Sequence, residues 1–151
     1  MNFLNSIDVS ASGLTAQRLR MDTIASNLAN AETTRVANGQ GPYRRHVVVF
    51  EAQNDKAGKG TFETTLQDQI NALSGVKVKE IKELGEDEAP FRKVYDPSHP
   101  DADADGYVNY PNVNVVEEMI NMISSNRAYE ANTKVIEASR AMALRALEIG
   151  R

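Results

Sequence analysis

The last part of the chain carries a single stripe of mostly apolar side chains at helical spacing. Its members are Val116, Ile120, Ile123, Arg127, Ala131, Val135, Ala138, Met142, Ala146 and Ile149. The average step of about 3.67 residues is the eleven-residue helical period, which predicts a nearly straight or slightly right-handed helix. At about 1.5 Å per residue this helix is roughly 55 Å long, whereas a compact domain of this size has a radius of gyration of only about 15 Å.

A second stripe occupies the start of the chain. Its members are Leu4, Ile7, Ala11, Leu14, Met21, Ala25 and Leu28. With Arg18 counted as an interruption, the step averages about 3.4 residues, a heptad-like seam on a helix roughly 40 Å long. Asn30, which tolerates a left-handed cap, and the β-branched Thr33 and Thr34 then predict that the helix ends near Ala31.

Two antiparallel helices can cover one seam of each other and little more, so further copies of the chain are expected to pack on the remaining faces. The alternative is a monomeric helix hairpin folded onto the middle segment. Four polar residues on the helices have two possible roles. They either form hydrogen bonds between helices or subunits, or make ordinary cap and surface contacts: Asn27, Asn30, Tyr129 and Asn132. The predicted assembly-interface residues are Leu4, Ile7, Ala11, Leu14, Met21, Ile24, Asn27, Leu28, Asn30, Val116, Met119, Ile120, Ile123, Tyr129, Val135, Met142, Leu147 and Ile149.

The middle of the chain predicts a small β-rich insert. Alternating and β-branched runs bounded by Gly and Pro indicate strands at 43–51, 75–83, 91–96 and 106–111, the first of them a buried-strand candidate. Residues 52–74 fit a mobile loop, a strand plus a short helix, or an exposed hairpin. The predicted class is therefore α+β: residues 1–34 and 112–151 form long terminal helices, packed as an antiparallel coiled-coil-like pair in one discontinuous core domain. Residues 35–111 form the insert.

The start of the C-terminal helix is marked by its polar residues. Asn112 or Asn114 suits the N-cap position, and Glu117 and Glu118 follow in the first turns, where the helix dipole favours acids. Gly150 predicts the end of the helix.

Composition excludes several functional classes. The 151-residue chain has no Cys, so disulfides, thiolate metal sites and cysteine nucleophiles are absent. Residues 1–31 and 113–151 are each neutral in net charge, which places the whole net charge of −4 in the middle and argues against nucleic-acid binding. The N-terminus shows no basic leader followed by an apolar run, so no cleaved signal peptide is expected. Nor is there the apolar run of about 20 residues that inserts into a membrane.

The segment "DADADG" at 101–106 begins like a calcium-binding loop. Such a loop needs a bidentate Glu at its twelfth position, where this chain has Asn112, and an entering helix, which Pro97 and Pro100 forbid. A tight polar turn in which Gly106 takes a positive φ is the better interpretation. An adventitious cation at 101–106, or a calcium-binding module over 101–112, stays as the alternative.

Catalytic signals are weak, so we expect no enzyme and no cofactor. His46 and His99 are the two histidines, and each fits a solvated or locally hydrogen-bonded role. There is no H-x-x-x-H pair and no G-x-S-x-G elbow. The acids of "EDE" at 86–88 suit a solvated turn, and a small hydrolase would lack a paired base and nucleophile.

Several stretches resemble the axial proteins of the bacterial flagellum. "SGLTAQRLRMDTIASNLANAETT" (12–34) is similar to the signature shared by rod, hook and hook-associated subunits, although Glu32 stands where a smaller polar residue is usual. "YDPSHPDADADGYVNYPNVNVVEEM" (95–119) and "RAYEANTKVIEASRAMALRALEIGR" (127–151) resemble the proximal rod type more narrowly. The larger distal rod or hook-type subunits are the alternative.

This resemblance implies a structural subunit that self-assembles and co-assembles into a helical tube, which transmits torque and encloses the export channel. It implies export by the flagellar export apparatus without a cleaved signal, with terminal helices that order on assembly. The implied partners are other copies, other rod subunits and basal-body proteins at the rod base, and the implied location is the basal body within the periplasm. The acidic turn would be the corner that leads the insert into the C-terminal helix.

Overall fold

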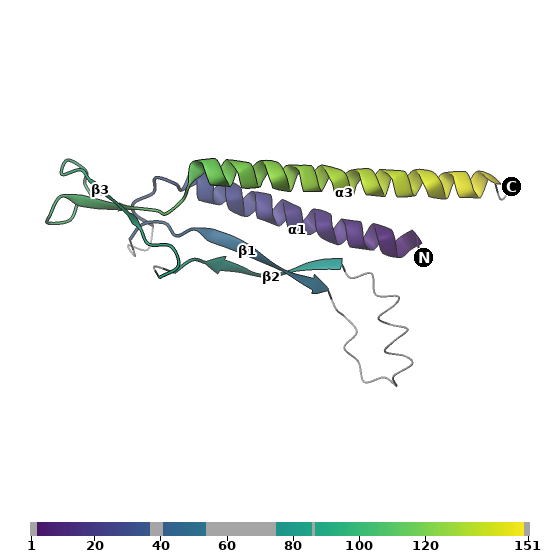
Figure 1. Cartoon of the computed structure of the whole chain (residues 1–151), viewed down its shortest axis with the longest axis horizontal. Coiled ribbons are helices and arrows are strands. Elements are labelled where there is room, and N and C mark those ends of the chain that lie inside the picture. The colour runs from purple at the N-terminus through teal and green to yellow at the C-terminus, as the bar shows by residue number, and fades with distance from the viewer. Residues whose placement is uncertain (1–2, 37–40, 54–74, 86, 150–151) are drawn as a thin grey trace, which may run out of the picture. The chain divides into compact units, whose positions relative to one another are not determined.

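The computed structural model describes residues 3–36, 41–53, 75–85 and 87–149. In chain order its elements are α1 (Phe3–Ala29), β1 (His46–Gln53), β2 (Gly75–Glu83), β3 (Arg92–Tyr95), β4 (Tyr107–Tyr110) and α3 (Val115–Ile149), as Figure 1 shows. The predicted α+β class, with two long terminal helices and short antiparallel strands between them, is confirmed. Among the described residues, no helix is both long enough and apolar enough to cross a membrane.

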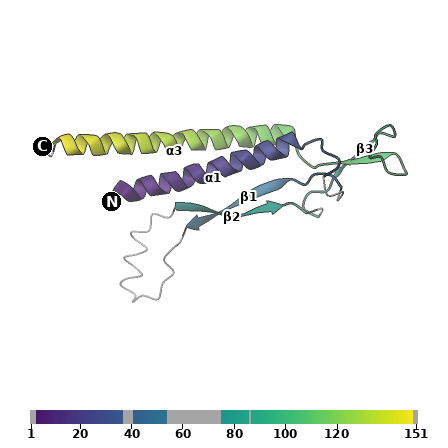
Figure 2. The ribbon, with the colours of Figure 1, turned by 180° about the vertical axis from the view of Figure 1, so that it is seen from behind.

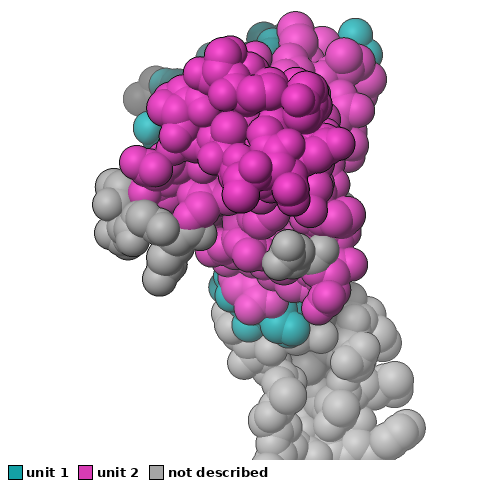
Figure 3. All heavy atoms as spheres, turned by 90° about the vertical axis from the view of Figure 1, so that its left-hand side faces the viewer, with its two compact units in different colours: residues 1–18, 50–79, 126–151 teal, residues 19–49, 80–125 magenta. Residues whose placement is uncertain are grey.

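The chain divides into two units, each of which combines parts of both helices with parts of the insert. Unit 1 comprises residues 1–18, 50–79 and 126–151, and unit 2 comprises residues 19–49 and 80–125 (Figure 3). In each unit a piece of α1 lies beside a piece of α3 that runs in the opposite direction (Figures 1 and 2). The predicted boundaries of a helical core domain and an insert at 34/35 and 111/112 stay a prediction.

In unit 1, α1 and α3 approach each other at Gly13, which has no side chain. A Cβ atom on Gly13 would lie 3.1 Å from Nδ2 of Asn132, so a larger residue there would force Asn132 aside. Ser12, beside this glycine, accepts a hydrogen bond on Oγ from the backbone N–H of Val76 at 3.0 Å. The start of α1 is thereby tied to β2 as well as to α3.

The helix ends follow the sequence closely. α1 ends at Ala29 and passes into a turn, close to the predicted end at Ala31. At the start of α3, Oδ1 of Asn114 accepts the backbone N–H of Val116 at 3.0 Å and that of Glu117 at 3.3 Å. Asn114, rather than Asn112, is therefore the N-cap, since its side chain satisfies donors that the first turn leaves without intrahelical partners.

The strands lie within three residues of their predicted bounds, and β2 matches its prediction at both ends. β1 pairs with β2, and beyond the strands the backbone N–H of Leu84 donates to the carbonyl of Arg45 at 2.9 Å. The prediction of a buried strand at β1 is wrong, because its side chains are half-buried or exposed. In the part of the chain that the structure describes, β1 and β2 form a two-stranded sheet, which leaves much of the surface of β1 open. Of the segment 52–74, only residues 52 and 53 are described, at the end of β1, and the rest lies outside the described residues.

The acidic turn closes a β-hairpin. β3 and β4 pair antiparallel with Val94 opposite Val108, and the loop between them returns through Gly106 at a φ of 81°. The predicted positive φ is confirmed, and a Cβ atom there would also lie 3.0 Å from the ring of Tyr95. After this turn the chain forms β4 and then enters α3 at Val115, so the turn lies between the two short strands predicted at 91–96 and 106–111. Asp103 and Tyr107 join the loop ends by a backbone hydrogen bond of 2.8 Å.

Two carboxylates of this loop, Asp103 and Asp101, have donors within the protein. Oδ1 of Asp103 accepts the backbone N–H groups of Asp105 and Tyr107, at 3.0 and 2.8 Å. Asp101 pairs with Arg35 at 2.8 Å and accepts the hydroxyl of Thr34 at 2.8 Å. These contacts give the acidic side chains a structural role in folding the loop.

Another carboxylate of the hairpin loop allows a direct titration test. Ser98 donates its hydroxyl at 2.6 Å and its backbone N–H at 3.1 Å to Oδ1 of Asp96, which holds the pKa of this carboxyl below its ordinary value of 3.8. A lowered pKa means that the contacts stabilise the folded loop above pH 3.8, and that this contribution is lost as the pH falls through the lowered value. Because the hydroxyl is the larger cause, Ser98→Ala is expected to move the Asp96 titration, followed by NMR, part of the way back to 3.8. Ser98→Thr should preserve the shift, and an unchanged titration in Ser98→Ala would contradict the assignment.

Candidate assembly surface

The large apolar members of the α3 stripe are exposed in the isolated chain. Their exposed fractions run from 46% for Val135 to 87% for Ile149. The set comprises Val116, Ile120, Ile123, Val135, Met142 and Ile149. Two further predicted interface residues, Met119 and Leu147, are also exposed. An apolar surface of this extent is typical of a region that a partner covers.

The opposite side of α3 is the side that is buried within the chain, and it is small and polar. Glu118, Ser125 and Ser139 are buried there, and Asn132 and Ile136 are half-buried. Within the chain α3 therefore buries its small, polar side and leaves the apolar stripe exposed. The physical reason is that small and polar side chains permit the close approach seen at Gly13, while the large aliphatic residues point outward.

α1 shows a different distribution. The half-buried seam residues are Ile7, Leu14, Met21 and Leu28, and Ile24 is buried. Ala11 is exposed, and the side chain of Leu4 lies outside the described residues. Seven exposed positions recur at steps of three and four along one narrow face: Asp8, Ala11, Thr15, Arg18, Asp22, Ala25 and Ala29.

The predicted polar candidates have separate roles. Asn30 donates to the carbonyl of Ser26 at 2.9 Å, and Asn132 donates to that of Ala128 at 3.0 Å, so both cap or brace their own helix. Tyr129 is half-buried on the inner side of α3. Of these four candidates, Asn27 is the one whose described hydrogen bonds reach other elements.

Asn27 is the centre of a buried polar cluster in unit 2. Its Nδ2 donates to the carbonyl of His46 at 2.8 Å and to Oε2 of Glu118 at 3.2 Å. Its Oδ1 accepts the backbone N–H of His46 at 2.9 Å and the hydroxyl of Tyr43 at 3.0 Å. The residue is 1% exposed, and these four hydrogen bonds join the end of α1, the start of β1 and the first turn of α3.

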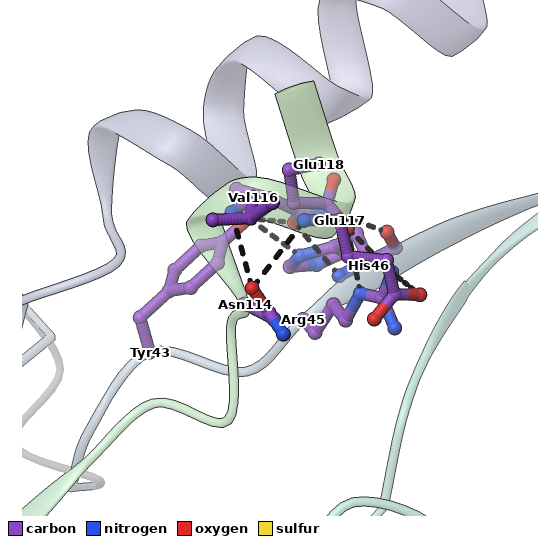
Figure 4. Close-up of polar contacts among 8 residues, drawn as sticks. Tyr43, Arg45, His46, Asn114, Val116, Glu117 and Glu118 are labelled. Carbon is purple, nitrogen blue, oxygen red and sulfur yellow. Dashed lines mark hydrogen bonds and ion pairs between the residues drawn. The ribbon is translucent and has the colours of Figure 1, made fainter. Parts of the chain in front are cut away.

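Arg45 completes the cluster from the residue before β1. Its Nε donates to Oε1 of Glu118 at 2.9 Å, and its Nη2 contacts the same oxygen and Oε1 of Glu117, the latter at 3.1 Å (Figure 4). The side chain of Glu118 is 2% exposed and that of Glu117 is 55% exposed. Burial lowers the pKa of Arg45, but hydrogen bonding and charge from Glu118, and then from Glu117, raise it above its ordinary value. The guanidinium thus remains charged and pairs with the buried carboxylate.

The position of Glu118 in the first turn predicts only an interaction with the helix dipole, and no sequence pattern predicts a role for Arg45. The available signal was spacing: Glu118 precedes Met122 and Ser125 by four and seven residues, which puts it on the inner side of α3. His46 and His99 have the local hydrogen bonds expected of them. Nδ1 of His46 lies 2.9 Å from the hydroxyl of Tyr43, and Nδ1 of His99 accepts the backbone N–H of Asp101 at 3.1 Å.

Comparison with known proteins agrees with this geometry. The family described as "Flagella basal body rod protein" matches residues 7–35, within α1 and the turn after it, and "Flagellar basal body rod FlgEFG protein C-terminal" matches residues 104–149, through α3. The chain is 45% identical to the flagellar basal-body rod protein FlgC of Bacillus subtilis over 100% of both chains. It is 46% identical to FlgC of Borreliella burgdorferi, over 99% of this chain and 98% of the relative, and 42% identical to FlgC of Escherichia coli O6:H1, over 99% of each. The chain therefore belongs to the FlgC family of flagellar basal-body rod proteins.

Proposed function

We propose that this chain is a structural subunit of the bacterial flagellar rod. It assembles with copies of itself and with other rod subunits into a helical tube that transmits torque and encloses the export channel. The observation that carries this proposal is the exposed apolar stripe of α3 in a member of the FlgC family.

The physical basis is the cost of leaving that stripe in water. Covering a side chain such as Ile120 or Ile123 stabilises by about 1.5–3 kcal/mol relative to full exposure. Burial of several such residues on one helix favours association, and head-to-tail contacts that do not close on themselves extend into a helical polymer.

The buried polar cluster has a structural role in this proposal. Asn27, Arg45 and Glu118 direct their polar atoms to one another, which holds the end of α1 against the start of α3. Within one subunit this fixes the relative direction of the two helix ends that are to pack with neighbours. The chain acts as a building element and not as an enzyme.

The partners follow from membership of a rod family. They are other copies of this chain, other rod subunits, basal-body proteins at the rod base and the flagellar export apparatus. The proposed location is the rod within the periplasm, reached by export without a cleaved signal peptide, and the terminal helices become fully ordered on assembly.

Sedimentation and imaging of the full chain test the proposal. At high concentration, alone or with co-purified rod subunits, the chain is expected to sediment as filaments whose helical lattice is resolved by electron cryo-microscopy. In dilute solution its terminal segments should be protease-sensitive, and the far-ultraviolet circular dichroism at 222 nm should strengthen on assembly. A chain that stays monomeric at every concentration and in every mixture, with both ends protease-resistant, would rule the proposal out.

A further inference from the structure

One charged residue interrupts the exposed apolar stripe of α3. Arg127 lies four residues after Ile123 and four before Ala131, and all three are exposed. Among the described residues, no carboxylate lies within ion-pair distance of its guanidinium. Three residues further on, the exposed Glu130 accepts a hydrogen bond from Asn126 at 3.0 Å. The outward surface of α3 therefore offers a positive and then a negative group beside the stripe.

The exposed face of α1 has the reciprocal arrangement. Arg18 and Asp22 are both exposed and lie four residues apart, so they lie on the same side of the helix. Within the described part of the chain neither takes part in an ion pair. The positions next to them on this face are small, with Ala25 and Ala29 after Asp22.

We propose that the α3 stripe of one subunit docks on the exposed α1 face of a second copy of this chain, with Arg127 paired to Asp22 and Glu130 paired to Arg18. This inference rests on the proposed assembly function and names the surfaces and the register of one contact in it. The two helices run antiparallel in this contact.

The order of the charges selects the direction. From Arg127 to Glu130 the rise along α3 is about 4.5 Å, and from Asp22 back to Arg18 it is about 6 Å along α1, a difference that long side chains span. In a parallel arrangement with the same first pair, Arg18 would lie opposite Ile123. A desolvated charge without a partner in an apolar contact is costly, so the parallel register is disfavoured.

The same register matches large side chains to small ones. Counting outward from the Arg127–Asp22 pair in the antiparallel direction, Ile123 lies near Ala25 and Ile120 lies near Ala29. Small residues let a neighbouring helix approach closely enough for ridges of large side chains to enter the grooves between them. Steric fit and charge order thus indicate one alignment.

Cross-linking of the full chain tests the register, because the chain has no Cys of its own. An Ala25→Cys chain and an Ile123→Cys chain are mixed, assembled and treated with a bis-maleimide of about 8 Å reach, since packed helix axes lie about 8–10 Å apart. An intermolecular adduct is expected on a denaturing gel. The matched control mixes Ala25→Cys with Ala131→Cys, the exposed stripe position that a parallel register would bring near Ala25, and should give several-fold less adduct.

Charge exchange then tests the pair itself. Arg127→Glu in the Ile123→Cys chain is expected to lower the adduct roughly tenfold, because like charges oppose each other in the contact. Asp22→Arg in the Ala25→Cys chain should restore it, while Arg140→Glu, which adds the same charge away from the stripe, should leave it unchanged. Circular dichroism at 222 nm checks that each variant keeps its helices.

The outcomes separate this inference from the proposed function. Suppose that filaments form but Ala25→Cys gives equal adduct with Ile123→Cys and with Ala131→Cys, or that Asp22→Arg does not restore the adduct. Either result overturns the inference and leaves the proposed function intact. A wild-type chain that forms no assembly in sedimentation overturns both.

Discussion

Glu118→Ala is expected to lower the free energy of unfolding by about 2–4 kcal/mol, a large fraction of the stability of a chain of this size. The carboxylate is almost fully buried, and its loss removes the acceptor of Arg45 Nε and one of the two acceptors of Asn27 Nδ2. Removal of one member of a buried charged pair costs more than the pair contributes, because the remaining charge stays desolvated. Urea unfolding of the full chain, followed by circular dichroism, measures the effect.

Glu117→Ala is the matched control, because Glu117 is the adjacent residue and contacts the same guanidinium. Its side chain is largely exposed, so water replaces the lost contact and the expected cost is below about 1 kcal/mol. Equal losses in the two variants would show that burial of Glu118 does not set the energetics of the cluster. Glu118→Gln should fall between them, since the amide keeps an acceptor for Asn27 but not the charge.

Ile123→Asp is expected to abolish assembly while leaving the isolated chain unchanged in stability to within about 0.5 kcal/mol. Ile123 is 54% exposed in the isolated chain, so the fold loses little when it is replaced. In an assembled stripe the substitution removes about 1.5–3 kcal/mol of apolar burial and adds a carboxylate that must be desolvated. Association should weaken by a factor of at least about 100, which analytical ultracentrifugation across a concentration series measures.

Leu144→Asp controls for the chemical change. Leu144 is on the same helix with a similar exposed fraction of 53%, but it lies away from the line of the stripe. The expected loss of association is therefore small beside that of Ile123→Asp. If both variants weaken assembly equally, the stripe is not the contact surface, whereas loss of helicity in Ile123→Asp alone would show that the residue stabilises the monomer.

The turns, helix ends and strands of this protein could be predicted because each depends on residues that are close together in the sequence. Asn114 supplies a cap acceptor to the backbone two and three residues ahead, and Gly106 takes a φ that other residues rarely adopt. β2 begins at Gly75, and β4 lies between Gly106 and Pro111. The helix periods, their end signals and the strand patterns together predicted the α+β class and the approximate bounds of every described element. The quoted motifs predicted the family resemblance, which the full-length relatives confirm.

Which residues meet across the chain was decided by the tertiary structure. Asn27 and Glu118 are 91 residues apart, and nothing local specifies that they and Arg45 share one buried cluster. The sequence likewise placed a strand on each side of the acidic loop but did not specify that the two strands pair, because the register of Val94 opposite Val108 depends on which segments come together.

The sequence by itself determined that α3 is amphipathic, since the spacing of its side chains fixes one apolar face. Only the tertiary structure decided that this face points outward and that Glu118, Ser125 and Ser139 point inward. The physical reason is that helical periodicity defines a face but not its partner. Close approach of helices at Gly13 and the hydrogen bonds of the buried Glu118 favour the small, polar side within the chain, which leaves the apolar side exposed for another molecule to cover.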